Sequence, residues 1–318
     1  MKIHFGVDSF QKLNSSVVTT GTFDGVHLGH KKILQKLCSI STKNSLESVL
    51  LTFTPHPRIY LFPNNNLKLI NSREENLSLF EDYGIDHVVF LKFDKSLSRL
   101  TYLDYVRDIL IKKIGMKHMV VGYDHQFGRN REGSIESLNE ISEIYSFETY
   151  EVNPVFVNNN AISSTKIRNY IEDGELEKVN KYLGHNFTLF GSVVRGQGKG
   201  KELGFPTANV KILDKNKIIP RDGVYAVYIH YNNNFYEGMM NIGPKPTFDF
   251  NEKSIEVNIF NFSQNIYNKK ISVEVIKRLR SVKKFKSVND LKLQIEQDKI
   301  LSLNVLNSKK KHNNFSEK

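Results

Sequence analysis

The sequence predicts two domains, an α/β domain with a mainly parallel sheet and then a small antiparallel β-barrel with a terminal helix. Three observations lead to this fold class. Short apolar runs alternate with helical patterns over residues 17–152, strand-like segments joined by turn-rich loops take over after Gly184, and one helical pattern closes the chain. The length of 318 residues also favours two domains, because a single compact core seldom extends so far.

The first half of the chain alternates between strand and helix signals. Apolar and β-branched runs predict strands at residues 16–20, 48–53, 87–93, 118–122 and 147–152, and helical spacing predicts helices at 31–37, 74–83, 102–114 and 134–144. Such alternation indicates parallel strands covered by helices on both faces. Ligands bind beyond the carboxyl ends of the strands in sheets of this kind.

A break at residues 153–154 precedes two further helices. The hydroxyls of residues 163–165 favour a helix start, Gly174 favours its end, and a second helix is predicted over residues 175–183. We therefore expect the first domain to span residues 1–184.

The second half carries mainly strand signals. The predicted strands span residues 187–194, 223–231, 235–241, 254–262 and 271–279, and one helix lies near 288–303. Short strands with turn-rich connections are typical of a small antiparallel barrel, which we expect over residues 185–306. Residues 307–318, with a basic run at 309–312, are expected to form a disordered basic tail.

One segment, Gly21-Thr22-Phe23-Asp24-Gly25-Val26-His27-Leu28-Gly29-His30, lies where the first of these strands gives way to a helix. Backbone N–H groups at a helix start are unpaired and bind anions. His27 and His30 can lie on one side of the opening turn and donate hydrogen bonds to phosphate oxygens as negative charge develops. The segment therefore predicts nucleotidyl transfer by electrostatic stabilisation.

Two other interpretations of the histidine pair stay open. Isolated H-x-x-H pairs are mostly capped and face solvent, although the strand-to-helix context favours phosphate binding here. Paired histidines also bind zinc in other proteins, but no third Cys, His or carboxylate lies nearby in an obvious motif.

Arg168 falls in the first turn of the helix that residues 163–165 cap. A guanidinium in this place can meet an outgoing pyrophosphate, and the hydroxyls add further donors. The alternative is an ordinary N-cap followed by a solvated arginine, and the residues alone favour that alternative.

A second glycine-rich segment, residues 196–201, contains lysines and precedes Leu203–Asn209. Glycines let backbone N–H groups wrap phosphates, and lysine supplies positive charge. The Walker A spacing is absent, and such a segment alone is more often a flexible hairpin.

Glu256, in an alternating strand pattern, is a candidate base that could accept the proton of an alcohol substrate. Its position alone favours a charged side chain on the surface.

Charge and cysteine content narrow the classes of function. Lys plus Arg is 45 and Asp plus Glu is 34, a formal net charge of +11 that invites nucleic-acid binding. The excess is spread along the chain, and the basic run at 309–312 lacks interleaved aromatic residues, so no specific nucleic-acid partner is expected.

Cys38 is the single cysteine, which excludes an intramolecular disulfide and favours the cytoplasm. The N-terminus lacks the apolar core of a signal peptide, no membrane span is expected, and oligomeric state stays open.

Six segments, in order, resemble the signatures of the bacterial bifunctional riboflavin kinase/FAD synthetase (FMN adenylyltransferase) family. They are GTFDGVHLGH at 21–30, TFTPHP at 52–57, GYDHQFG at 122–128, ISSTKIR at 162–168, LGFPTAN at 203–209 and NIGPKPTF at 241–248. The resemblance extends over nearly the whole chain. It implies a nucleotidyltransferase-type, Rossmann-like first domain and a riboflavin kinase barrel.

The resemblance also implies a reaction sequence and site residues. The barrel would phosphorylate riboflavin with ATP to FMN, and the first domain would transfer AMP from a second ATP onto FMN to give FAD and pyrophosphate, both with Mg²⁺. Catalytic roles are implied for His27, His30, Arg168 and Glu256, and magnesium binding for Thr207 and Asn209. Nucleotide contacts are expected at Gly21, Phe23, Asp24, Gly25, Gly29, Asp124, Ser163, Ser164, Thr165, Gly198, Lys199, Gly200 and Asn241.

The chain departs from the family's pattern in the second domain. The family commonly reads E-V-H-x-x-D-F where this chain has Asn258 and Asn261, and Val282 replaces a usual acidic residue. These departures leave open an FMN adenylyltransferase with an impaired kinase domain. A basic nucleic-acid-binding protein is the alternative from a different class.

Overall fold

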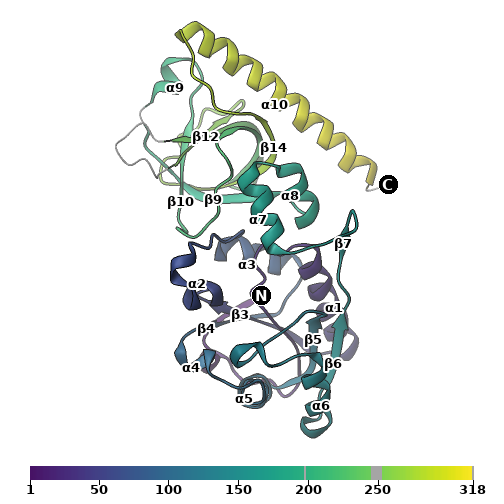
Figure 1. The fold of residues 1–318 in the computed structure, drawn as a ribbon. Helices are drawn as coiled ribbons and strands as arrows, with labels where there is room; N and C mark the ends of the chain where they lie inside the picture. Colours follow the sequence, from purple (N-terminus) through teal and green to yellow (C-terminus); the bar gives the residue numbers. More distant parts are fainter. Residues whose placement is uncertain (197, 245–252, 317–318) are drawn as a thin grey trace. The chain divides into compact units, whose positions relative to one another are not determined.

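The computed structural model describes residues 1–196, 198–244 and 253–316. The chain divides into two compact units (Figure 1). The first unit comprises residues 1–68 and 76–164, and the second comprises residues 69–75 and the chain from residue 165. The units are described separately below.

A six-stranded parallel sheet forms the centre of the first unit, in the order β1-β4-β3-β2-β5-β6. The strands are β1 (Lys2–Phe5), β2 (Ser16–Thr20), β3 (Glu47–Thr54), β4 (His87–Lys92), β5 (Met116–Gly122) and β6 (Glu148–Val152). The five predicted strands are confirmed, and β1 is an additional edge strand. From β2 the chain runs through β3 to β4 and then returns to β5 on the other side of β2. The loops after β2 and β5 therefore flank the point where strand order reverses, the usual ligand crevice of such sheets.

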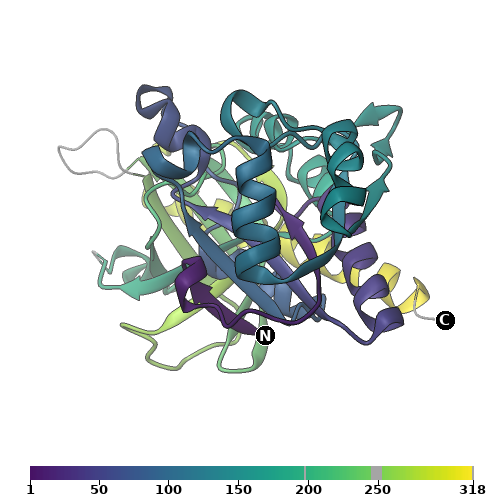
Figure 2. The same ribbon diagram turned by 90° about the horizontal axis from the view of Figure 1, so that it is seen from below.

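Helices cover both faces of this sheet (Figures 1 and 2). One face packs on α1 (Leu28–Asn44) and α3 (Arg73–Asp82), and the other on α5 (Tyr102–Asp104), η3 (Tyr105–Ile114) and α6 (Ile135–Tyr145). Successive strand residues alternate between the two cores: Val17, Leu50 and Val88 lie in one, and Val18, Leu51 and Val89 in the other. Burial on both faces explains why these strands read as continuous apolar runs.

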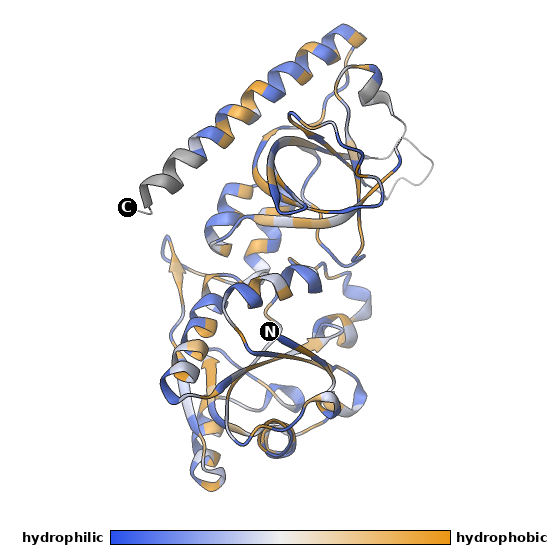
Figure 3. Ribbon diagram, turned by 180° about the vertical axis from the view of Figure 1, so that it is seen from behind, coloured by the Kyte–Doolittle hydropathy of each residue, from blue (hydrophilic) through white to orange (hydrophobic). Residues whose placement is uncertain are grey.

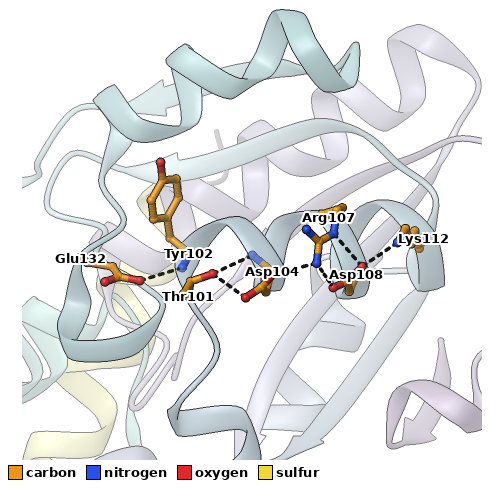
Figure 4. Close-up of polar contacts among 7 residues, drawn as sticks. All are labelled: Thr101, Tyr102, Asp104, Arg107, Asp108, Lys112 and Glu132. Atoms are coloured by element: carbon orange, nitrogen blue, oxygen red, sulfur yellow. Dashed lines mark hydrogen bonds and ion pairs between the residues drawn. The ribbon is translucent and has the colours of Figure 1, made fainter.

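The helix predicted over residues 102–114 is present, but its main part, η3, has the wider turn of a π-helix. The Thr101 hydroxyl caps the start by accepting a hydrogen bond from the Asp104 N–H at 3.1 Å. Arg107 Nη2 lies 2.7 Å from Asp104 Oδ1 and 2.5 Å from Asp108 Oδ2 (Figure 4). Lys112 Nζ lies 2.8 Å from Asp108, so a chain of ion pairs runs along the outer side of this helix.

The remaining elements of the first unit are short. They are η1 (Val7–Ser9), α2 (Pro57–Leu61), η2 (Pro63–Asn65), α4 (Lys95–Ser98), η4 (Arg129–Arg131) and the hairpin of β7 (Phe156–Val157) with β8 (Asn160–Ala161).

The second unit contains a closed barrel of antiparallel strands in the order β10-β13-β12-β11-β14-β9. The strands are β9 (Phe187–Val194), β10 (Ala208–Ile212), β11 (Gly223–Tyr231), β12 (Asn234–Pro244), β13 (Lys253–Ile259) and β14 (Lys270–Arg280). The helices are α7 (Ser164–Asp173), α8 (Leu176–Leu183), α9 (Lys199–Glu202) and α10 (Val288–Ser316). The barrel is confirmed, and β10 is a sixth strand that the sequence pattern did not predict.

The last helix, α10, lies along the outside of the barrel and mixes hydrophobic with hydrophilic positions (Figures 1 and 3). Tyr228 OH donates a hydrogen bond to the Leu306 carbonyl at 2.8 Å, and Lys309 Nζ donates to Asn186 Oδ1 at 2.6 Å. These contacts anchor the helix past residue 306, and it runs to Ser316 where a disordered tail was expected from residue 307. Residues 317–318 lie outside the described part of the chain.

When the chain is divided by its internal contacts, the main part of the second unit begins after Ser164. The sequence predicted the domain boundary near Gly184, which lies later in the chain. The reason is that α8 packs on β9 and β14 of the barrel. Which catalytic domain α7 and α8 serve stays a prediction.

Residues 69–75, far from the barrel in sequence, belong to the second unit. Leu69 pairs with Lys217 as an isolated parallel bridge. The Lys217 ammonium donates to the Ile70 carbonyl at 2.6 Å and to Glu75 Oε2 at 2.5 Å. Both side chains of this ion pair are buried, with exposures of 0% and 5%. Glu75 Oε1 also accepts from the Phe190 N–H at 2.8 Å, so the buried carboxylate is well bonded.

Candidate functional sites

The loop after β2 has an unusual backbone. Phe23, Gly25 and Val26 have φ angles of 48°, 87° and 39°. Positive φ is rare for a β-branched residue, and such strain tends to occur at ligand sites. Phe23 and Val26 are buried at 2% and 0% exposure, so core packing holds the loop in this conformation.

His27 is the N-cap of α1, and its Nδ1 atom accepts a hydrogen bond from the His30 N–H at 3.3 Å. Accepting at Nδ1 favours the neutral tautomer with a proton on Nε2, which is a donor. A Cβ on Gly29 would lie 3.2 Å from the His27 ring, so glycine leaves room for the imidazole there.

The His27 and His30 rings stack with centroids 3.6 Å apart and an interplanar angle of 12°. Burial holds the pKa of His30 well below its usual value, and the neighbouring His27 lowers it further. His30 Nδ1 is buried and has no hydrogen-bond partner among the described residues. The solvent-facing interpretation of the pair is therefore wrong, since His27 is only 7% exposed.

Ser164 joins the fourth motif, at residues 162–168, to the loop after β2. Its hydroxyl donates a hydrogen bond to the Asp24 carbonyl at 2.9 Å. Ser163 is half-buried and Thr165 is exposed. Arg168, on α7 in the second unit, is only 8% exposed, so the solvated-arginine interpretation is wrong as well.

Asp124 is exposed in the loop after β5, one residue past Tyr123. A Cβ on Gly122 would lie 3.6 Å from Asp124 Oδ1, so the carboxylate turns back toward the end of the strand. His125 follows, and burial lowers its pKa to about 4. Its ring stacks on Phe127 at 5.5 Å. The spacing around His125 gives no sign of this burial, because the residue lies within a loop motif.

The barrel contains a cavity of about 690 Å³. Its lining includes six of the residues that the sequence analysis selected: Gly198, Gly200, Thr207, Asn209, Asn241 and Glu256. The backbone of Lys199 begins α9, and its side chain lies outside the described part of the structure. Residues from four separate segments thus meet at one site.

Glu256 lies between two asparagines. On β13 it pairs with Asn209 of β10 on one side and with Asn241 of β12 on the other. Its Oε2 atom accepts a hydrogen bond from the Thr207 hydroxyl at 3.4 Å, and Oε1 accepts from the Ser254 hydroxyl at 3.2 Å. Glu256 is half-buried in the cavity, so the surface-charge interpretation is wrong.

The glycine-rich segment folds against the motif that follows it. The Phe205 N–H donates to the Gly200 carbonyl at 2.8 Å. A Cβ on Gly200 would lie 2.5 Å from the Phe205 carbonyl oxygen and 3.2 Å from Thr207 Oγ1. Glycine is therefore required for this close approach.

The departures from the family pattern have different surroundings. Asn258 and Val282 line the cavity, whereas Asn261 is exposed with a left-handed φ of 54°.

An ion pair at the cavity was not predicted from the sequence. Arg280 on β14 forms a fork with Asp298 on α10, at 2.6–3.1 Å, and Asp298 is 2% exposed. No short-range pattern connects these two residues.

Among residues 1–196, 198–244 and 253–316, no group of three or more His, Cys, Asp or Glu side chains could hold a metal ion. Over the same residues, no helix combines the length and apolarity needed to cross a membrane.

Fold and candidate sites together are typical of a transferase with one phosphate-binding segment in a parallel α/β domain and a second, polar site in an antiparallel barrel. The FAD synthetase family model matches residues 9–166, and the riboflavin kinase family model matches residues 183–306. The chain therefore belongs to the bifunctional riboflavin kinase/FMN adenylyltransferase family, which confirms the resemblance seen in the sequence.

Individual relatives match most of the chain. Bifunctional riboflavin kinase/FMN adenylyltransferases of Buchnera aphidicola subsp. Schizaphis graminum and Bacillus subtilis are 38% and 35% identical, covering 94% and 89% of this chain and 96% and 90% of theirs. A solved Streptococcus pneumoniae structure described as a macrolide-efflux protein is 32% identical, with a TM-score of 0.87 over 95% of this chain and 99% of that one.

Proposed function

We infer that the protein makes FAD from riboflavin in two ATP-dependent steps. The barrel phosphorylates riboflavin to FMN, and the parallel-sheet domain adenylylates FMN to FAD and releases pyrophosphate. The observation that carries this conclusion is the joint presence of both family matches and both candidate sites in one chain. An adenylyltransferase-only enzyme and a nucleic-acid-binding protein are not favoured.

In the adenylyl transfer, the FMN phosphate attacks the α-phosphorus of ATP in line with the departing pyrophosphate. The N–H groups at the start of α1 and the Nε2 proton of His27 would bind the phosphate oxygens as negative charge shifts between them. Polyphosphate close to the stacked rings would raise the lowered pKa of His30 and draw a proton to the site. Arg168 is the residue that the family resemblance implies for charge on the pyrophosphate, and its side chain is only 8% exposed.

In the kinase step, Glu256 is the proposed base for the riboflavin hydroxyl that attacks the γ-phosphorus of ATP. Its two hydrogen bonds, from Thr207 and Ser254, fix the orientation of the carboxylate. Backbone N–H groups around Gly198 and Gly200 would bind the phosphates.

Mg²⁺ is part of the proposal, with Thr207 and Asn209 as its protein ligands. Both side chains carry neutral oxygens on the cavity wall next to a carboxylate, the hard ligand type that Mg²⁺ prefers, with phosphates and waters completing the shell. When bound, the ion would neutralise charge on the β- and γ-phosphates.

We also propose a cytoplasmic location, in line with the single cysteine, and no specific nucleic-acid partner.

The test follows two time courses with the purified protein. One reaction starts from riboflavin with ATP and Mg²⁺, the other from FMN, and chromatography resolves riboflavin, FMN and FAD. FMN followed by FAD in the first reaction supports the inference. FAD from FMN without any FMN from riboflavin would limit the enzyme to adenylyl transfer, and neither product would overturn the assignment.

A further inference from the structure

Asn258 is buried, at 8% exposure, and its side-chain Nδ2 donates a hydrogen bond to the Pro206 carbonyl at 2.6 Å. This contact connects a residue that departs from the family pattern with the segment that carries Thr207. We propose that Asn258 is a positioning residue for ATP and its metal ion in the riboflavin kinase reaction. The proposal rests on the function inferred above.

The contact lies where backbone pairing ends. Strands β10 and β13 pair at Asn209 with Glu256 and at Ala208 with Val257, and among the residues that the structure describes this ladder has no further pair. One residue further along β13, the Asn258 amide takes over and bonds to the carbonyl that precedes Thr207. A side chain thus continues the pairing and fixes the Pro206–Thr207 peptide against β13.

The fixed peptide determines two distances at the cavity. On one side, the Thr207 hydroxyl lies 3.4 Å from the Glu256 carboxylate. On the other, the N–H of Phe205, the residue before Pro206, donates to the Gly200 carbonyl at 2.8 Å, so the glycine-rich segment is bonded to the chain just ahead of this peptide. If the Asn258 bond is lost, both the candidate metal ligand and the candidate phosphate loop lose their common support. The side chain therefore acts through Thr207 and Gly200 and makes no chemical step itself.

The chemistry of the contact requires a donor on residue 258. An amide N–H donates at every pH, whereas a carboxylate has only acceptor oxygens and would repel both the Pro206 carbonyl and the Glu256 charge. A histidine, the residue commonly present in the family, keeps an N–H. We therefore expect substitutions of Asn258 to preserve kinase activity when the new side chain has a hydrogen-bond donor. Its charge or size alone should not decide the outcome.

The experiment compares Asn258→Asp, Asn258→Ala and Asn258→His in the full chain, with Asn261→Asp as the matched control on the exposed bend that follows β13. Kinase rates are measured while ATP and Mg²⁺ are varied separately, and conversion of FMN to FAD by the same samples reports on folding. We expect Asn258→Asp and Asn258→Ala to raise the KM for ATP and the Mg²⁺ requirement about tenfold or more, as for loss of one buried hydrogen bond. Asn258→His keeps a donor, so its KM for ATP and its Mg²⁺ requirement should stay much closer to the wild type than those of the other two variants. Asn261→Asp should match the wild type in both quantities.

Each outcome bears on a separate claim. Unchanged ATP and Mg²⁺ dependence in Asn258→Ala would overturn the positioning role. A parallel loss of FMN adenylylation and of thermal stability in all Asn258 variants, including Asn258→His, would overturn it too, because the role would then be structural. If the wild type forms no FMN from riboflavin, the inferred kinase function itself fails.

Discussion

The two sites of this enzyme are built in different ways. In the first unit, ten consecutive residues, 21–30, supply a strained loop, a helix N-terminus and a stacked histidine pair. In the barrel, the cavity draws its polar residues from separate strands, which meet only when Asn209, Glu256 and Asn241 come into register. The first site is encoded locally, and the second depends on the closure of a fold. The following predictions test this difference.

The largest effect is expected from Glu256→Gln, which keeps the size of the side chain and one acceptor oxygen, with an NH2 group that can donate to the second hydroxyl, but removes the base. Riboflavin phosphorylation should fall by about 10²–10⁴-fold, the usual contribution of general base catalysis. FMN adenylylation by the same protein should be unchanged. A kinase rate near that of the wild type would show that the carboxylate is not the base.

His27→Asn separates the two roles of His27. Asparagine is a good N-cap, so α1 should keep its stability, but the imidazole donor is lost. FAD formation from FMN should drop by about 10²–10³-fold, as for removal of one donor to a developing charge. The kinase rate serves as the control. Undiminished FAD formation would mean that capping is the whole function of His27.

Lys217→Met tests how far the barrel site depends on residues distant in sequence. The substitution leaves the Glu75 carboxylate buried without its cation, at an expected cost of about 3–5 kcal/mol. Kinase activity should therefore be lost at lower urea concentrations than FMN adenylylation in the same samples.

Two variants serve as controls for Lys217→Met. Adding Glu75→Gln should recover much of the loss. Lys277→Met removes an exposed pair with Glu177 at 3.0 Å and should cost no more than about 1 kcal/mol. Equal effects of Lys217→Met and Lys277→Met would contradict the importance of burial.

The smallest effect concerns pH and the first unit. Because burial lowers the pKa of His125 to about 4, this side chain stays neutral in the folded state while the unfolded chain takes up a proton below the ordinary histidine pKa. The contribution of His125 to stability should therefore be constant above about pH 7 and fall as pH decreases toward 4, by up to roughly 3 kcal/mol. Urea midpoints across this range, with His125→Phe as the variant that lacks the proton site, measure the contribution. A wild-type and variant difference that does not change with pH would contradict it.

The comparison also explains what the sequence could predict. The parallel sheet, its helices and five barrel strands follow from periodicity and local motifs, whereas the candidate residues of the barrel site were selected through the family resemblance and stay predictions. Strand β10 was not predicted, because Ala208 and Asn209 were read only as part of a binding motif. The positive φ of Val26 has no local sequence signal, since it is imposed by packing. The Arg280–Asp298 fork and the Lys217–Glu75 pair join residues whose separation carries no pattern, so only the fold reveals them.

Residues 69–75 have a consequence for the order in which the chain is made. The ribosome completes this segment well before it reaches Phe190 and Lys217, which bond to Glu75 in the folded protein. During synthesis, residues 69–75 are made before the residues that bond to them, so the Glu75 carboxylate has no cation until Lys217 has been added to the chain. A gene divided at Gly184 would place Lys217 and its counterion on different polypeptides, so a barrel fragment that begins there would lack the buried carboxylate of Glu75.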